Sequence, residues 1–422
     1  MTKMDHDKLD EEARAILKNN DRGGYTLPTA GLYPYQWNWD SAFAAWGFSA
    51  FDIDRAWSEL ESLLGGQWPN GMVPHILFHV PDPGYFPGPD VWGTQGIGPI
   101  ASSGISQPPV AASFARLIYD ADPDAGRERL RPLLPKLVEW HRWFMDWRSD
   151  EGAICITHPW EAGRDNAPDW DGAMAAIDPV GVGEYTRRDT SHVDPSMRPT
   201  KEDYDRYIWL VQRGKKLGWD EAKMAENRPF MVADPTMTFT FLRSNRDLAD
   251  LTEALGGDRV ELDDWSAEVE AGAGTLWNDA LGSYDSRDVV SGEWSQSISN
   301  ASFLCWWGGV DNPQMLAVLE RVSDAAPFAV ASYDPEGPKF NARRYWRGPV
   351  WGIMNTLIGM GLEACGHKAE AARLRETTRK LIEDHGFAEY FDPLTGDPAG
   401  GMNFTWTAAI WLGWVSPGAG RH

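Results

Sequence analysis

Residues 127–147 read RERLRPLLPKLVEWHRWFMDW, and their apolar side chains recur mostly at intervals of three or four positions. The recurring residues are Leu130, Leu133, Leu134, Leu137, Trp140, Phe144 and Trp147. Because an α-helix turns once in about 3.6 residues, this spacing gathers them on one helical face that must be buried against a partner. The stretch therefore predicts a helix over residues 127–147 that belongs to a larger helical assembly.

Similar helical patterns occur along most of the chain. We expect further helices over residues 1–20, 41–64, 108–119, 201–217, 234–255, 262–276, 313–319, 348–365, 368–382 and 404–414. No region alternates strands and helices as a parallel sheet requires, and only short pieces such as Gly282–Asp285 suggest small hairpins. Paired helices in this number favour an all-α fold, an (α/α)6 barrel in which an outer ring of helices surrounds an inner ring.

Two long irregular segments interrupt the helices. Residues 65–106 are dense in Gly and Pro, and residues 160–200 are rich in Asp and Arg. Loops of this length inside a compact domain are usually functional. No linker or shift in composition divides the chain, so we expect one catalytic domain over residues 1–422 with two loop insertions that cover the rim of its active site.

The charge balance excludes several classes of partner. The chain has 39 basic and 62 acidic residues, a formal charge of -23, which argues against binding to nucleic acid or to an anionic membrane surface. No apolar run of about 18 or more residues suggests a membrane span, and the charged N-terminus does not resemble a signal peptide. We expect a cytoplasmic protein, with aromatic loops that are compatible with a homo-oligomer.

Motifs for metals, cofactors and serine nucleophiles are missing. Cys155, Cys305 and Cys365 lie far apart, which predicts reduced thiols in or near the core. No phosphate-binding glycine loop, Gly-x-Ser-x-Gly or His-Glu-x-x-His occurs, and prolines separate His75 and His79 from any long helix. We therefore expect no cofactor and no metal site.

Tryptophan is unusually frequent, with 23 in 422 residues. Indole faces stack on the C–H faces of sugar rings, and the indole N–H can donate to a hydroxyl group. Together with the polar loops, this content favours a carbohydrate site over purely structural packing.

The segment His158–Trp170 (HPWEAGRDNAPDW) combines acids, an arginine and an amide between two tryptophans. Its prolines and glycine exclude a regular helix, so it predicts an ordered loop of a sugar pocket. Glycoside hydrolysis needs two carboxyl groups across the scissile bond, one of them with a raised pKa. Asp165, with Trp160 and Trp170 nearby in sequence, is the candidate for the carboxyl group that keeps its proton.

The candidate partner of Asp165 lies in the segment His385–Gly396 (HGFAEYFDPLTG). Glu389 stands there between aromatic residues, whereas Asp392 begins an Asp-Pro-x-x-Gly turn and is more typical of a turn residue. Two other aromatic clusters, residues 33–40 and 343–351, add stacking surfaces and charges, although packing between helices explains both equally well.

These segments resemble glycoside hydrolase family 63. Residues 161–166 (EAGRDN) resemble its Glu-x-Gly-x-Asp-Asn signature, of which the family 37 trehalases carry a related form. Residues 33–43 resemble the early Trp-Asp motif, residues 344–351 the Tyr-Trp-Arg-Gly-Pro-x-Trp motif, and residues 389–392 the Glu-x-x-Asp segment. The compact chain is similar to the bacterial mannosylglycerate and glucosylglycerate hydrolases of this family.

The resemblance implies an (α/α)6 barrel and inversion of the anomeric centre, with Asp165 as general acid and Glu389 as general base. It also implies that Arg198, helped by Tyr85, holds the carboxylate of a glycerate aglycone. The residues that would line the subsite for the cleaved glucose or mannose are Tyr33, Trp37, Asp40, Gln107, Trp160, Gly163, Tyr345, Trp346 and Trp351.

The prediction is thus a hydrolase of a small sugar substrate, α-glucosylglycerate or α-mannosylglycerate. An α-glucosidase or trehalase-like enzyme for neutral disaccharides is the alternative within the same class. A sugar 2-epimerase on this fold would need paired histidines, which the scattered histidines disfavour. A non-catalytic sugar-binding protein is disfavoured because both carboxyl groups are present.

Overall fold

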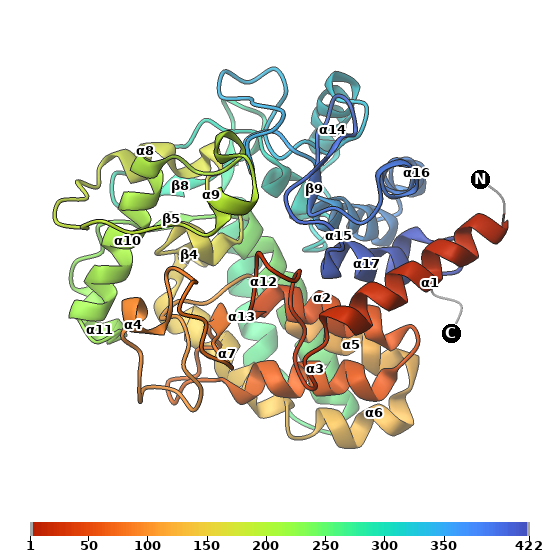
Figure 1. The fold of residues 1–422 in the computed structure, drawn as a ribbon, viewed down its shortest axis with the longest axis horizontal. Coiled ribbons are helices and arrows are strands. Elements are labelled where there is room, and N and C mark those ends of the chain that lie inside the picture. Colours follow the sequence, from red (N-terminus) through yellow and green to blue (C-terminus); the bar gives the residue numbers. More distant parts are fainter. Residues whose placement is uncertain (1–2, 420–422) are drawn as a thin grey trace.

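The computed structural model describes residues 3–419, and its inner helices form a closed ring (Figure 1). Each inner segment packs against the next one along the chain, and the last packs against the first. These segments are α2 (Asn38–Ser49), α5 (Ala111–Ala121), α12 (Pro235–Ala254), the 3-10 segment η4 (Asn300–Cys305), α15 (Gly352–Ala364) and α17 (Thr405–Ile410). Six inner segments in a cycle confirm the predicted (α/α)6 barrel.

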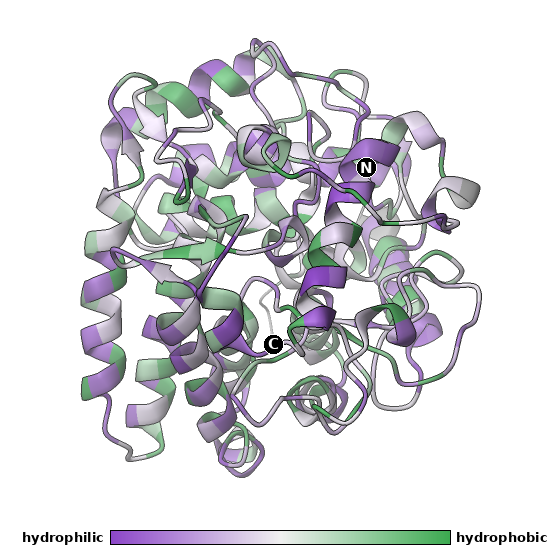
Figure 2. Ribbon diagram, turned by 90° about the vertical axis from the view of Figure 1, so that its left-hand side faces the viewer, coloured by the Kyte–Doolittle hydropathy of each residue, from purple (hydrophilic) through white to green (hydrophobic). Residues whose placement is uncertain are grey.

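A second layer of helices surrounds the inner ring. Helix α1 (Lys3–Asn20) packs on α17, α3 (Ile53–Gly65) on α2, α6 (Pro123–Leu130) on α5, and α16 (Lys368–His385) on α15. Helices α7 (Leu134–Trp147) and α13 (Val260–Gly274) cover α12. Helix α14 (Pro313–Ala325) lies beside strand β7 (Ser283–Tyr284), which contacts η4. Hydrophilic and hydrophobic residues alternate along the helices at the surface that Figure 2 shows, as expected when one face meets water.

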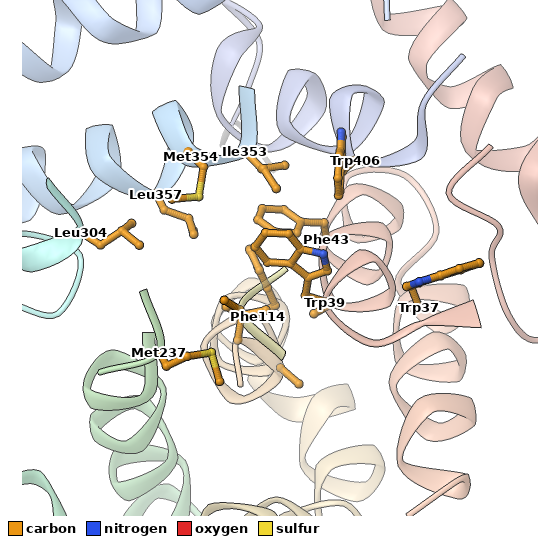
Figure 3. Close-up of a cluster of buried hydrophobic side chains, with 14 of the residues drawn as sticks. Trp37, Trp39, Phe43, Phe114, Met237, Leu304, Ile353, Met354, Leu357 and Trp406 are labelled. Carbon is orange, nitrogen blue, oxygen red and sulfur yellow. The ribbon is translucent and has the colours of Figure 1, made fainter. Parts of the chain in front are cut away.

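Large apolar side chains fill the middle of the inner ring. Figure 3 shows residues from all six inner segments pointing toward one another: Trp39, Phe43, Phe114, Met237, Leu304, Ile353, Met354, Leu357 and Trp406. All of them are buried. Each large apolar side chain contributes about 1.5–3 kcal/mol when it is removed from water, so the ring has a packed core rather than a channel.

Three predicted helices are interrupted. The pattern over 41–64 is two helices, because the chain turns after Ser49 and Asp52 caps α3 by accepting a hydrogen bond from the Arg55 N–H. The pattern over 127–147 is divided between α6 and α7, because Pro132 and Pro135 lack the N–H groups of a continuous helix. The last helix ends at Ile410 and continues as a π-helical turn, Trp411–Val415.

The other predicted helices are confirmed, although α14 continues beyond the predicted end at Leu319 to Ala325. Helix α10 (Lys201–Lys216) follows the second long loop. The prediction for Met1 and Thr2 lies outside the described residues. Short helices occupy the long loops, namely α4 (Pro89–Trp92), α8 (Asp171–Ala175) and α9 (Asp189–His192), and another short helix, α11 (Glu221–Ala225), follows α10. Within residues 3–419, no helix has the length and apolar character that a membrane crossing requires.

The strands are short and pair only antiparallel. Strand β1 (Gln36–Trp37) pairs with β2 (Ile76–Leu77), and β9 (Tyr390–Phe391) with β10 (Pro398–Ala399). The hairpin predicted near Gly282 is confirmed as β6 (Trp277–Asn278) with β7 (Ser283–Tyr284). The sheet of four strands is β3 (Ser149–Asp150), β4 (Ala153–Ile156), β5 (Val232–Ala233) and β8 (Arg287–Asp288). Cys155 and Cys305 are buried and Cys365 is partly buried, as predicted.

The ring closes where α17 meets α2, and this contact depends on a glycine. A Cβ atom at Gly47 would lie 2.7 Å from the Cβ of Ala409, closer than two side-chain carbons can approach. Gly47→Ala should therefore separate the two helices and lower the free energy of unfolding by about 1–3 kcal/mol, as overpacking does in other cores. Urea or thermal unfolding measures this loss.

Gly274, in α13, provides the matched control, because a Cβ atom there meets no heavy atom within 4 Å. Gly274→Ala should leave stability unchanged or raise it by about 0.5–1 kcal/mol, since alanine is the better helix former. Equal stability of the two variants would contradict the role assigned to Gly47.

Candidate active site

A cavity of about 110 Å³ opens at one end of the ring. Both long loops contribute to its wall, which includes His75 and Tyr85 from the first and Asp189 and Arg198 from the second. Most residues predicted to form the site line this cavity, namely Tyr33, Trp37, Asp40, Tyr85, Gln107, Trp160, Gly163, Asp165, Arg198, Tyr345 and Glu389.

Trp346 and Trp351 are not among the lining residues, which corrects their predicted place in the sugar subsite. Both are fully buried and stack on each other, with ring centroids 3.7 Å apart. The indole N–H of Trp351 donates to the carbonyl of Tyr345 at 3.2 Å, and the rings of the two residues make an edge contact. Of these three residues only Tyr345 lines the cavity, and the buried tryptophan pair packs behind it and fixes its position.

Several other residues that line the cavity carry no distinctive signal in the sequence. Asp189 and Arg188 belong to the loop rich in Asp and Arg, where many charged residues made none of them distinctive. Tyr204 and Trp406 stand on helices α10 and α17, where no motif distinguishes them from aromatic residues that pack between helices. Only their position at the mouth of the ring distinguishes these residues.

The segment 158–170 forms two short 3-10 turns, Pro159–Ala162 and Pro168–Trp170, around the predicted irregular loop. Gly163 adopts φ +67°, and a Cβ atom there would lie 2.6 Å from the ring of Trp39. Only glycine fits this approach without displacing the tryptophan. The loop is therefore pressed against α2, with Asp165 two residues beyond the contact.

Two fully buried arginines anchor this loop. Arg148 binds Glu161 at 3.1 Å and Glu221 at 2.8 Å. Arg164 binds Asp169 at 2.9 Å and Asp234 at 3.0 Å. Buried charges are tolerated only when they are paired, and removal of one partner costs about 3–5 kcal/mol. The pairs therefore hold both ends of the loop rigid.

Asp165 is fixed through its backbone, while its carboxyl group remains available to the cavity. Its carbonyl accepts hydrogen bonds from the Trp170 indole at 2.9 Å and from the Tyr207 hydroxyl at 2.8 Å. Burial raises the pKa of Asp165 to about 7, against the opposing charge of Arg198, and the nearby Glu389 adds to the rise. A carboxyl group in this state keeps much of its proton near neutral pH and can donate it.

Glu389 lies in the loop after α16, just before strand β9, and both of its oxygens accept hydrogen bonds. The Tyr33 hydroxyl donates to Oε1 and the Gly401 N–H donates to Oε2, both at 2.8 Å. A Cβ atom at Gly400 would lie 2.3 Å from Oε2, so a glycine is required beside the carboxylate. Burial raises the pKa of Glu389, while Arg198 and the two donors oppose this rise by favouring the charged form.

Asp40 stands in the first turn of α2 and is 4% exposed. Burial, together with the negative charge of Glu389, raises its pKa well above the usual range. Asp40, Asp165 and Glu389 therefore bring three carboxyl groups into one narrow space. A polar ligand with several hydroxyl groups would find both donors and acceptors there.

Arg198 supplies a positive charge to the same wall. Its Nε donates to Asp189 at 3.1 Å, its Nη2 donates to the Tyr33 hydroxyl at 2.7 Å, and its Nη1 lies 3.7 Å from Glu389. The guanidinium also lies 4.2 Å from the ring centroid of Tyr345. Among the described residues, no group of three or more His, Cys, Asp or Glu side chains is arranged to hold a metal ion.

A helical toroid with paired carboxyl groups and aromatic walls at its mouth is the arrangement of a glycoside hydrolase. Residues 33–407 match the family model for the mannosylglycerate hydrolase MGH1-like glycoside hydrolase domain. This match covers most of the chain, which therefore belongs to that family of glycoside hydrolases, as the motifs predicted.

Individual relatives agree with this assignment. The mannosylglycerate hydrolase of Thermus thermophilus is 43% identical over 413 residues, with 96% of this chain and 100% of the relative covered. The glucosylglycerate hydrolase of Mycolicibacterium hassiacum is 34% identical over 437 residues, covering 97% and 98% of the two chains. The family 63 mannosylglycerate hydrolase from another strain of Thermus thermophilus, solved with Tris and D-glycerate, has a TM-score of 0.92 at 42% identity, covering 95% of this chain and 98% of that chain.

The pKa of Asp165 predicts the alkaline side of the pH profile. If protonated Asp165 is the active form, kcat/KM should fall as the pH rises through about 7, because a raised pKa keeps the proton only below that value. Rates measured from about pH 5 to pH 9 test this. A glycosyl fluoride, whose leaving group needs little protonation, is the control and should lose this dependence. If kcat/KM for a glycoside with an alcohol leaving group instead declined from about pH 4, protonated Asp165 would not be the active form.

Proposed function

We propose that the protein hydrolyses a small α-glycoside of glycerate, mannosylglycerate or glucosylglycerate, with inversion at the anomeric carbon. Asp165 protonates the oxygen of the leaving group, and Glu389 removes a proton from the attacking water. An inverting hydrolase needs its two carboxyl groups about 6.5–9.5 Å apart, so that the water fits between Glu389 and the sugar.

The observation that carries this proposal is that the two carboxyl groups of one cavity have different hydrogen-bond partners. No hydrogen bond from another described residue reaches the carboxyl group of Asp165, and burial raises its pKa to about 7. Glu389 receives two hydrogen bonds and lies beside Arg198, all of which favour its ionised form. A protonated acid and an ionised base in one site are what acid/base hydrolysis of a glycoside requires.

The glycone subsite lies among the aromatic residues. Trp37, Trp160 and Tyr345 line the cavity together with Asp40 and Gln107. Rings suit the C–H faces of a hexose, whereas the carboxyl and amide groups suit its hydroxyls.

The aglycone subsite lies near Arg198, with Tyr85 and Arg188 on the same wall. A guanidinium group binds a carboxylate with two parallel hydrogen bonds, so this wall suits an acidic aglycone even though the protein as a whole carries a charge of -23. The Thermus thermophilus relative solved with Tris and D-glycerate supports the same choice.

A panel of α-glucosides and α-mannosides followed by proton NMR tests the reaction. We expect hydrolysis of glycerate glycosides with the β-anomer of the hexose as first product, because water attacks from the face opposite to the leaving group. Asp165→Asn should lower kcat by about 100-fold or more, since general acid catalysis contributes about 10²–10⁴. Retention of configuration, or preference for neutral disaccharides such as trehalose, would overturn the proposal.

Replacement of Arg198 tests the aglycone. Arg198→Ala should lower kcat/KM for glycerate glycosides about 10–100-fold more than for methyl glycosides of the same hexose, because a charge-assisted hydrogen bond contributes about 1.5–3 kcal/mol. Arg206→Ala is the matched control, since Arg206 lies on α10 and pairs with Glu202 outside the cavity. Equal losses on both types of substrate would exclude Arg198 as the site of the carboxylate.

A further inference from the structure

The Tyr33 hydroxyl connects two opposite charges. It lies 2.8 Å from Oε1 of Glu389 and 2.7 Å from Nη2 of Arg198. An arginine can only donate hydrogen bonds, and a tyrosine hydroxyl has one proton. Tyr33 must therefore accept from Arg198 and donate to Glu389, so the direction of the chain from guanidinium through phenol to carboxylate is determined.

Arg198 is held firmly at its other end. Its Nε donates to Asp189, which also accepts two hydrogen bonds from Arg187, at 3.0 and 2.6 Å. The side chain is 4% exposed, yet Nη1 has no hydrogen-bond partner among the described residues. Both N–H groups of the buried Nη1 atom thus lack a hydrogen bond to any described residue, 3.7 Å from Glu389, in a wall where an acidic ligand would be bound.

We propose that Tyr33 is a positioning residue that transmits the charge of Arg198 to Glu389, so that an anionic aglycone bound at Arg198 makes Glu389 a stronger base. This inference rests on the proposed roles of Arg198 and Glu389 and adds a link between them. It makes the aglycone part of the catalytic apparatus rather than only a source of affinity.

The physical reason is the change in charge when the aglycone binds. In the empty site Arg198 polarises the phenol, which then donates strongly to Glu389 and keeps the carboxylate ionised and weakly basic. A carboxylate placed on Arg198 cancels that positive charge, so the proton affinity of Glu389 increases. A stronger base takes a proton from water more readily, and a neutral aglycone would lack this effect.

Other charged or titratable groups also face Glu389, and they are the same whichever aglycone is bound. They are Asp40, Asp165, Asp189, Tyr345 and Tyr390. All remain when Tyr33 is replaced by phenylalanine. A difference between that variant and the wild type therefore reports the hydroxyl of Tyr33.

The first test is the acid side of the pH profile. For glycerate glycosides, the acidic pKa of kcat should exceed that of kcat/KM by about 1 unit, the size expected when a neighbouring charge is cancelled. For methyl glycosides of the same hexose the two values should coincide. Tyr33→Phe should narrow the gap for glycerate glycosides, whereas Tyr119→Phe, which removes a hydroxyl from a buried tyrosine outside the cavity, should preserve it. An absent gap in the wild type, or an unchanged gap in Tyr33→Phe, would overturn the proposal.

The second test does not depend on turnover. The Glu389 carboxyl signal can be followed by carbon-13 NMR in protein labelled at glutamate, with Glu389→Gln to identify it. Without ligand, Tyr33→Phe should raise the pKa of Glu389, because the carboxylate loses a donor. In the wild type, D-glycerate should raise it too, and less so in the variant. If the enzyme did not hydrolyse glycerate glycosides, the proposed function would fail. The titration of Glu389 without ligand would still test whether Tyr33 controls the pKa of Glu389. A pKa of Glu389 unaffected by Tyr33→Phe would exclude it.

Discussion

The contact between α2 and α17 is the constraint on which the rest of the structure depends. It joins the beginning of the barrel to its end, through a glycine that lets the two helices touch at Gly47 and Ala409. Without this closure the apolar residues at the centre of the ring would face water. The same closure places the loop after α16 beside the start of α2, so that Glu389 meets Tyr33.

The active site contains several buried charged groups, and these groups differ in how many partners of opposite charge or hydrogen-bond donors they have. Arg148 and Arg164 are paired with two carboxylates each and hold the loop of Asp165. The carboxyl group of Asp165 has no ion pair or hydrogen bond from another described residue, and burial raises its pKa to about 7 against the opposing charge of Arg198. Glu389 is compensated by donors and by Arg198. Burial raises the pKa of both carboxyl groups, but only Glu389 has hydrogen-bond donors that stabilise its charged form.

The proposed link through Tyr33 extends this principle to the substrate. Arg198 is near enough to Glu389 to favour its ionised form in the empty site, and the same guanidinium is the group best suited to an acidic aglycone. The charge of Arg198 would then both bind the aglycone and set the basicity of Glu389. Binding of the correct substrate would thereby raise the rate, because only an acidic aglycone makes Glu389 more basic.

The sequence alone determined the class of fold, the two catalytic candidates and most of the cavity wall, since helical periodicity and short motifs are local properties. It did not determine the breaks after Ser49 and Leu130, where turns and prolines overrode the apolar pattern. Only the tertiary structure separated Tyr345 from the tryptophans buried beneath it, and only it placed Asp189 at the site. Glu389 lies 224 positions after Asp165. Their meeting in one cavity, and the hydrogen bonds that reach the carboxylate of Glu389 alone, follow from closure of the ring, because contacts between distant segments exist only in the folded chain.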